Sequence, residues 1–105
     1  MSTSNFTEDS PREEVSNHAL RILKKLDCER YVREEAIRLI ERADKQGLLT
    51  HGTTKGLAAG VVYIACILRE DRMTLETIGN VVGLSGSSVS QNYMILARGL
   101  GYGTR

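Results

Sequence analysis

Residues 57–68 of this 105-residue chain have the sequence LAAGVVYIACIL, and none of their side chains is charged. The run is about a dozen residues long, well short of the ~20 that a bilayer-spanning helix needs. A helix that is apolar on every side must be surrounded by other elements of the protein. We therefore expect a buried central helix, from about Lys55 to Arg69, in a soluble protein. Neighbouring backbones can come close to it at its small residues, which are Ala58, Ala59, Gly60 and Ala65.

The segments before this run have the pattern of amphipathic helices. Ser10 offers an N-cap hydroxyl and Pro11 stands at the first helical position, so a helix is expected to start there. Apolar residues at helical spacing continue it to about Asp27, and a second set predicts a helix over residues 29–46. Gly47 is expected to end that helix. The caps of later helices are expected at Thr53 or Thr54 and at Ser85.

A polar loop over residues 49–54 precedes the central helix, and two shorter helices are expected after it, at 74–82 and 85–100. Gly83 can adopt the positive φ that a tight turn between them requires. Gly79 is small where the two helices nearly touch, and this spacing follows the helix-turn-helix pattern. We expect the last helix to pack on the central one through Val89, Tyr93, Leu96, Ala97 and Leu100.

The composition favours one all-α domain. Hydrophobic residues make up 41% of the chain and charged residues 26%, as in ordinary globular proteins. There is no Trp, one Phe and one Pro, and β-branched residues never alternate with polar ones, which argues against a β-sandwich. We expect a disordered N-terminal tail over residues 1–10, one helical domain over 11–100 and a C-terminal tail over 101–105. The N-terminal tail has no apolar stretch, so it is interpreted as neither a signal peptide nor a membrane anchor.

Charge supports nucleic-acid binding only weakly. The chain has 14 Lys and Arg against 13 Asp and Glu, which argues against a polybasic protein that holds DNA by charge alone. Residues 47–105 carry five basic and three acidic side chains, a net charge of +2. The expected phosphate contacts are Lys55, Arg72 and Arg98. Two or three such contacts give weak affinity and a shallow salt dependence, so the domain alone is expected to bind DNA poorly.

The outer side of the last helix is the candidate DNA-reading surface. A helical wheel places on it Ser87, Ser88, Gln91 and Arg98, with Ser90 and Asn92 on the flanks. Gln and Asn can pair bidentately with adenine, and Ser can reach a base or a phosphate. The alternative, that these are merely solvated polar positions, carries equal weight. Met94 and Ile95 also point outward and indicate a contact with another protein.

Two stretches together resemble a known family. Gly47-Leu48-Leu49 followed by residues 55–65, KGLAAGVVYIA, resembles the third-helix signature of the cyclin-like repeat in transcription factor IIB and in its archaeal equivalent, transcription factor B. Residues 74–78, TLETI, with Val89 and Tyr93, resemble the helix-turn-helix of that repeat. The resemblance covers about residues 12–100. It implies an all-α, five-helix cyclin-box fold with a buried third helix and a C-terminal helix-turn-helix.

The resemblance also implies a role in transcription initiation. Factors of this class have a zinc ribbon and two repeats, which bind the TATA-binding protein on promoter DNA. The second repeat, which this chain most resembles, contacts the element beside the TATA box through its helix-turn-helix. Neither a zinc ribbon nor a second repeat is found here, so we expect an excised domain or a small stand-alone relative, with polymerase contact only as part of a larger factor. The expected location is the cytoplasm of an archaeon, at the nucleoid.

The resemblance is incomplete in the last helix. Ser90 and Asn92 stand where the family commonly places basic residues. The alternative function is therefore a cyclin-like interaction or regulatory module that binds a protein, or a second copy of itself, without DNA.

No enzymatic or metal-binding pattern is found in the sequence. Cys28 and Cys66 belong to no CxxC pair, which argues against a zinc ribbon or a redox motif, and Cys66 is interpreted as a small core residue in a reducing cytosol. His18 and His51 have no partners at the spacing of a catalytic triad. Residues 52–56, GTTKG, lack the order of a phosphate-binding loop. We expect no catalysis, no cofactor and no metal.

Overall fold

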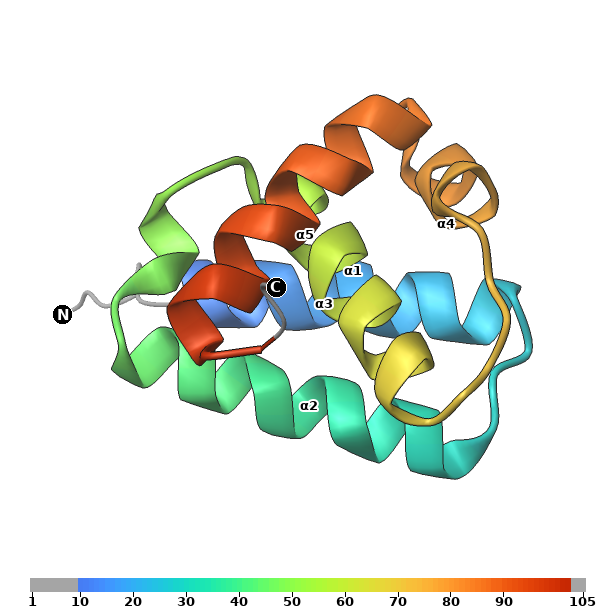
Figure 1. Ribbon diagram of the computed structural model, residues 1–105, viewed down its shortest axis with the longest axis horizontal. Coiled ribbons are helices and arrows are strands. Elements are labelled where there is room, and N and C mark those ends of the chain that lie inside the picture. Colours follow the sequence, from blue (N-terminus) through green and yellow to red (C-terminus); the bar gives the residue numbers. More distant parts are fainter. Residues whose placement is uncertain (1–9, 103–105) are drawn as a thin grey trace, which may run out of the picture.

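The computed structural model describes residues 10–102, so the expectations for residues 1–9 and 103–105 lie outside the described part. Within residues 10–102 the chain is helical and contains no strand. The predicted all-α fold is confirmed. The elements, shown in Figure 1, are α1 (Pro11–Lys25), α2 (Arg30–Lys45), the 3-10 turn η2 (Leu48–Thr50), α3 (Thr54–Leu68), α4 (Leu75–Val82) and α5 (Gly86–Leu100).

Helix α3 is the centre of the structure and contacts α1, α2, α4 and α5. In Figure 1 it lies between α1 behind it and α5 across its front, with α2 running below. Residues 56–62 and 64–66 are buried, so the predicted burial of the central helix is confirmed. The prediction is wrong for its last turn, because Ile67 is 47% exposed and Leu68 40%. No helix among the described residues is long and apolar enough to span a membrane.

The packing of α5 on α3 depends on the small residues of α3. A Cβ added at Gly60 would lie 3.0 Å from the backbone nitrogen of Tyr93 and 3.0 Å from a methyl of Leu96. Such a distance is tighter than ordinary van der Waals contact, so a side chain at this crossing would require α5 to shift by a few tenths of an ångström. One turn further along, the rings of Tyr63 and Tyr93 meet edge to face with their centroids 4.9 Å apart. The predicted apolar face of α5 is confirmed, since Val89, Leu96, Ala97 and Leu100 are buried and Tyr93 is half-buried.

Four of the five long helices begin with a side-chain cap. Each capping hydroxyl accepts a hydrogen bond from the backbone N–H three residues later, which satisfies one of the free donors of the first turn. The predicted caps at Ser10 and Ser85 are confirmed, and Thr53 rather than Thr54 caps α3. The capped pairs are Ser10 with Glu13, Thr53 with Gly56, Thr74 with Thr77 and Ser85 with Ser88.

Helices α1, α3, α4 and α5 also end alike, in a Schellman motif. A residue with positive φ follows each helix, and the next backbone N–H donates back to the carbonyl five residues earlier. Glycine takes the positive φ after α4 and α5, but Asp27 (φ 56°) takes it after α1 and Glu70 (φ 58°) after α3. The returning bonds are Cys28 to Leu23, Asp71 to Cys66, Leu84 to Gly79 and Tyr102 to Ala97.

The link between α2 and α3 is not the polar loop that we expected. Leu49 is only 3% exposed, because η2 turns it into the core, and Leu48 packs against Gly99 of α5. Arg42 of α2 fixes the other side of this junction. Its guanidinium donates to the carbonyl of Leu100 at 3.1 Å and to the hydroxyl of Tyr102 at 2.6 Å. The end of α5 is thereby held against α2 and η2.

The turn between α4 and α5 closes over Gly79. The N–H of Leu84 donates to the Gly79 carbonyl at 2.9 Å, and Gly79 itself is buried under the turn. A Cβ at this position would overlap the carbonyl oxygen of Leu84 and lie 3.1 Å from a methyl of Val89. Backbone atoms cannot yield in the way that the end of a flexible side chain can. The side chain of residue 79 must therefore be a hydrogen atom.

We predict that Gly79→Ala lowers the free energy of unfolding by about 2–3 kcal/mol, because the overlap outweighs the gain in helix propensity. The matched control is Gly83→Ala, which meets open space and suffers only the strain of its φ of 76°, at a cost of about 1 kcal/mol. Urea unfolding followed by far-ultraviolet circular dichroism measures both. Equal losses in the two variants would contradict the close approach at Gly79.

Candidate functional site

The exposed side of α5 forms one continuous surface. Its exposed residues follow the helical repeat, so they lie in a single row along the side turned away from α3. We call this row the outer stripe; it consists of Ser87, Gln91, Met94, Ile95 and Arg98. The two apolar members are well exposed, Met94 at 51% and Ile95 at 43%. The polar members lie toward both ends of the helix and the apolar ones between them.

A hollow follows one flank of the outer stripe. From α5 it is lined by Ser88, Gln91, Asn92 and Ile95, and from the turn before α5 by Leu84. Its opposite wall is the loop that leads into α3, with His51, Gly52 and Thr53. The hollow therefore joins the N-terminal half of α5 to the capped N-terminus of α3.

A second hollow follows the other flank. Ser87 and Ser90 line it from α5, and Tyr63 lines it from α3. The loop before α4 and its first turn complete it, with Met73, Thr74, Leu75 and Glu76. The serines that sequence analysis placed together are thus divided between the two flanks. Ser88 faces one hollow, and Ser87 and Ser90 face the other.

Asn92 lies on a flank of α5, where the helical wheel placed it, and its side chain turns toward the loop before α3. Its side-chain amide donates to the carbonyl of Ser88 at 2.9 Å. The same amide covers the backbone of the loop before α3, since a Cβ at Gly56 would lie 2.6 Å from its nitrogen and a Cβ at Gly52 2.8 Å from its oxygen. Asn92 is half-buried and joins α5 to α3. A contact of Asn92 with DNA stays a prediction from the sequence.

The predicted cationic contacts lie on α5 and on the segments beside it. Lys55 is exposed in the first turn of α3, beyond the first hollow. Arg72 is exposed in the loop that continues into the wall of the second hollow. Arg98 is exposed in the last turn of α5 itself. The three side chains thus lie on both sides of α5 and near its C-terminus.

The charge near Lys55 depends on the protonation of His18, a residue of α1. The pKa of His18 is lowered, chiefly because partial burial disfavours the charged imidazole and further because Arg21 and Lys55 repel it. Its Nδ1 atom is buried without a hydrogen-bond partner. The neutral form of His18 therefore predominates at neutral pH. It adds no positive charge to the surface around Lys55.

Two other arginines on this part of the fold are already engaged. Arg42 holds the end of α5, as described above, and also lies over the ring of Tyr102. Arg69 lies 3.3 Å from the carboxylate of Glu35 and over the ring of Tyr31. These contacts position helices.

The sequence matches a family of known proteins over almost all of this structure. The family model described as "Transcription factor TFIIB repeat" matches residues 9–99, which include every helix described above except the last residue of α5. The chain belongs to the TFIIB repeat family. The resemblance seen in residues 47–65 and 74–93 is thereby confirmed. The family is one of transcription factors, not of enzymes.

Similar relatives of this TFIIB repeat are archaeal proteins named transcription initiation factor IIB. The protein from Pyrococcus furiosus is 32% identical over 80 residues, which are 76% of this chain and 27% of that protein. The protein from Aeropyrum pernix is 31% identical over 91 residues, or 87% of this chain and 28% of that protein. This chain therefore spans little more than a quarter of the length of these relatives.

Sequence analysis of this TFIIB repeat missed the loop before α3 as part of the site. His51 and Thr53 line the same hollow as Ser88 and Gln91, although about 37 residues separate the two segments. The signal that pointed to this contact was the pair Gly52 and Gly56, four residues apart, which leaves room for a side chain from another helix. The identity of that side chain, Asn92, could not be derived from spacing.

We predict that Asn92→Ala lowers the free energy of unfolding by about 1–2 kcal/mol, since it leaves the space above Gly52 and Gly56 empty and removes a hydrogen bond. The neighbouring change Gln91→Ala, on an exposed side chain, is expected to stay within about 0.5 kcal/mol. Thermal unfolding of the two variants beside the parent measures the difference. If Asn92→Ala is as stable as Gln91→Ala, the structural role of Asn92 is wrong.

Proposed function

We propose that this TFIIB repeat acts in transcription initiation by binding promoter DNA together with the TATA-binding protein. In this proposal α4 and α5 act as a helix-turn-helix, and α5 enters the major groove. Family membership supports the role in initiation, since the relatives are named for it. The outer stripe of α5 supports the choice of surface, because it combines an exposed helix with polar residues near its N-terminus.

The chemistry of the first half of α5 suits a DNA groove. A major groove about 12 Å wide admits an α-helix, and small residues near the helix N-terminus allow close approach. Ser87 is exposed there, and Gln91 one turn later can pair bidentately with adenine. The two flanking hollows leave room for the walls of the groove, and Ser88 and Ser90 line them. Ser87 and Gln91 are therefore proposed to contact base edges, with Ser88 and Ser90 at the sugar–phosphate backbone.

Lys55, Arg72 and Arg98 are proposed as the phosphate contacts. Because Lys55 and Arg72 lie on opposite flanks of α5, they can reach the two strands that border one groove. Three contacts predict that the logarithm of the binding constant falls with the logarithm of salt concentration with a slope of about −2 to −3. Three phosphate contacts give only weak affinity for DNA, so the proposal includes the TATA-binding protein as a second partner in the complex.

This role would place the domain at chromosomal DNA. Contact with RNA polymerase is proposed only for a longer factor that contains such a repeat, since this chain spans about a quarter of its relatives. We also propose that this chain corresponds to the second of the two repeats in such factors, rather than to the first.

The experiment is a fluorescence anisotropy titration of labelled promoter DNA with and without an archaeal TATA-binding protein. We expect a ternary complex whose affinity falls by about 5- to 150-fold in Gln91→Ala, the range for loss of a bidentate base contact. Arg98→Ala should weaken binding to all sequences alike and reduce the salt slope by about one. Arg38→Ala, an exposed arginine in the middle of α2, is the matched control and should change neither. Absence of a ternary complex at low salt would contradict the proposal.

Met94 and Ile95 support a second candidate function, a protein-interaction module without DNA binding. They lie side by side on the outer stripe, where two exposed apolar side chains are better suited to a protein surface than to phosphates. Such a module could also regulate initiation by competing with a longer factor for a shared partner.

If α5 mediates self-association, the double variant Met94→Ser, Ile95→Ser should shift a concentration-dependent dimer to monomer, because it removes the apolar area that association would bury. Light scattering over a range of protein concentrations measures the change. Ile37→Ser is the matched control, since Ile37 is exposed to a similar extent (40%) on α2. A parent chain that is already monomeric at every concentration would exclude self-association through this surface.

A further inference from the structure

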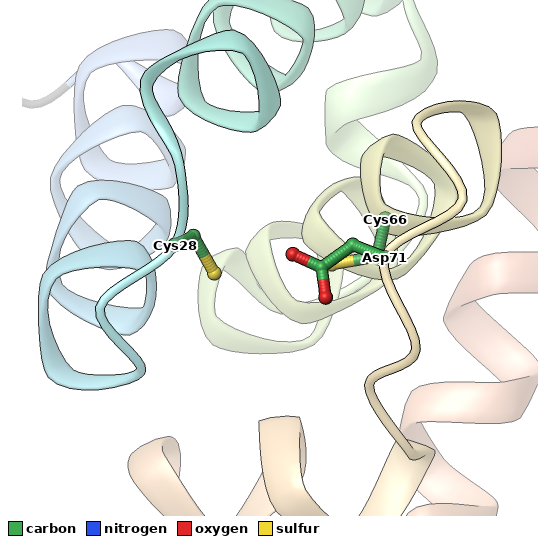
Figure 2. A group of neighbouring side chains, drawn as sticks. All are labelled: Cys28, Cys66 and Asp71. Atoms are coloured by element: carbon green, nitrogen blue, oxygen red, sulfur yellow. The ribbon is translucent and has the colours of Figure 1, made fainter.

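Two cysteines and an aspartate from distant parts of the sequence meet at one end of α3. Cys28 lies in the turn between α1 and α2, Cys66 in the last turns of α3, and Asp71 in the loop that leads to α4. Their sulfur and carboxylate oxygen atoms all lie within 4.8 Å of one another. Figure 2 shows the three side chains pointing toward a common space from two separate segments. Both cysteines are free thiols.

Backbone hydrogen bonds fix the positions of these three residues. Asp71 and Cys66 are joined directly, since the N–H of Asp71 donates to the Cys66 carbonyl at 2.7 Å. Cys28 is fixed in the same way at the end of α1, where its N–H donates to the Leu23 carbonyl at 3.0 Å. Cys28 and Asp71 therefore hold equivalent places in two Schellman motifs. The cluster is assembled by the fold and needs no rearrangement of the chain.

We propose that Cys28, Cys66 and Asp71 form a binding site for a thiophilic divalent cation, with Zn²⁺ as the ion that fits best. Zn²⁺ takes four ligands in a tetrahedron, with Zn–S distances of about 2.3 Å and Zn–O distances of about 2.0–2.2 Å. Ligand atoms in such a tetrahedron are roughly 3.3–3.8 Å apart by this geometry. Side-chain rotations that move each atom by about 1 Å or less would bring the present cluster to that arrangement.

The donor set determines which ions are suitable. Two thiolates select soft or borderline cations, whereas Mg²⁺ and Ca²⁺ prefer sets made of oxygen alone. Three protein ligands leave a fourth position for water. Water and the ion can reach it from outside, because Cys28 is only half-buried and lines a hollow with Leu20, Lys24 and Arg33.

Binding would release protons and connect two segments. Each thiol gives up its proton to solvent as its sulfur binds the ion, so two protons leave for each Zn²⁺ bound. Burial raises the pKa of Cys66 to about 12, with the neighbouring Cys28 and Asp71 adding to the shift, and burial also raises the pKa of Cys28. Affinity should therefore increase as pH rises. The bound ion would tie the α1–α2 turn to the loop that positions α4.

The test is a Zn²⁺ titration of the reduced full chain in competition with a chromophoric chelator. We expect one ion per chain with submicromolar affinity. Cys28→Ser should weaken it at least about 100-fold and Asp71→Asn about 10-fold. Both residues are partly exposed, so these variants should fold, and far-ultraviolet circular dichroism checks this. Asp44→Asn, an exposed carboxylate at the end of α2, is the control and should bind like the parent.

A second readout keeps the proposal testable if Cys28→Ser does not fold. Co²⁺ in place of Zn²⁺ should give a thiolate charge-transfer band and the intense visible bands of a tetrahedral ion, and both should be altered in Asp71→Asn. Binding that survives both substitutions, or a Co²⁺ spectrum without thiolate character, would assign the ion to other groups such as the histidines and overturn the proposal. Absence of Zn²⁺ binding by the reduced chain would also overturn the proposal. This holds whether or not air can oxidise the two cysteines to a disulfide.

Discussion

The close contact between α3 and α5 across the glycines of α3 is the constraint on which the rest of the structure depends. Gly60 allows the backbone of α5 to lie directly on α3, and Gly56 allows the Asn92 amide to fill the space beside it. Once α5 is fixed there, its outer stripe must face away from the core. The turn over Gly79 then sets where α4 lies, and Arg42 holds the far end of α5. A larger side chain at Gly60 would push α5 away from α3 by a few tenths of an ångström.

The sequence predicts most of the fold because its local signals agree with one another. The capping residues Ser10 and Ser85 indicate where two helices begin. The uncharged run after Lys55 indicates a helix that must be buried. What the sequence misses depends on three-dimensional packing. The burial of Leu49 and the exposure of Ile67 depend on which parts of the folded chain lie beside them, and the periodicity of the sequence does not contain that information.

The candidate site is less predictable than the fold for the same reason. A helical wheel separates the buried from the exposed side of α5, and it places Gln91 and Arg98 correctly on the outside. It cannot show that Asn92 packs against Gly52 and Gly56, or that Cys28 and Cys66, 38 positions apart, meet at the end of one helix. Charge count is equally incomplete, because it cannot show that Arg42 and Arg69 contact other parts of the fold.

The tyrosine pair between α3 and α5 gives the protein a natural optical probe. The chain has no tryptophan and four tyrosines, and two of these, Tyr63 and Tyr93, meet edge to face across the contact that orients α5. Fixed aromatic packing produces a near-ultraviolet circular dichroism signal that disappears when side chains lose their order, even where helix content is retained. Separation of α5 from α3 would thus be visible without any label and could be distinguished from melting of the helices themselves.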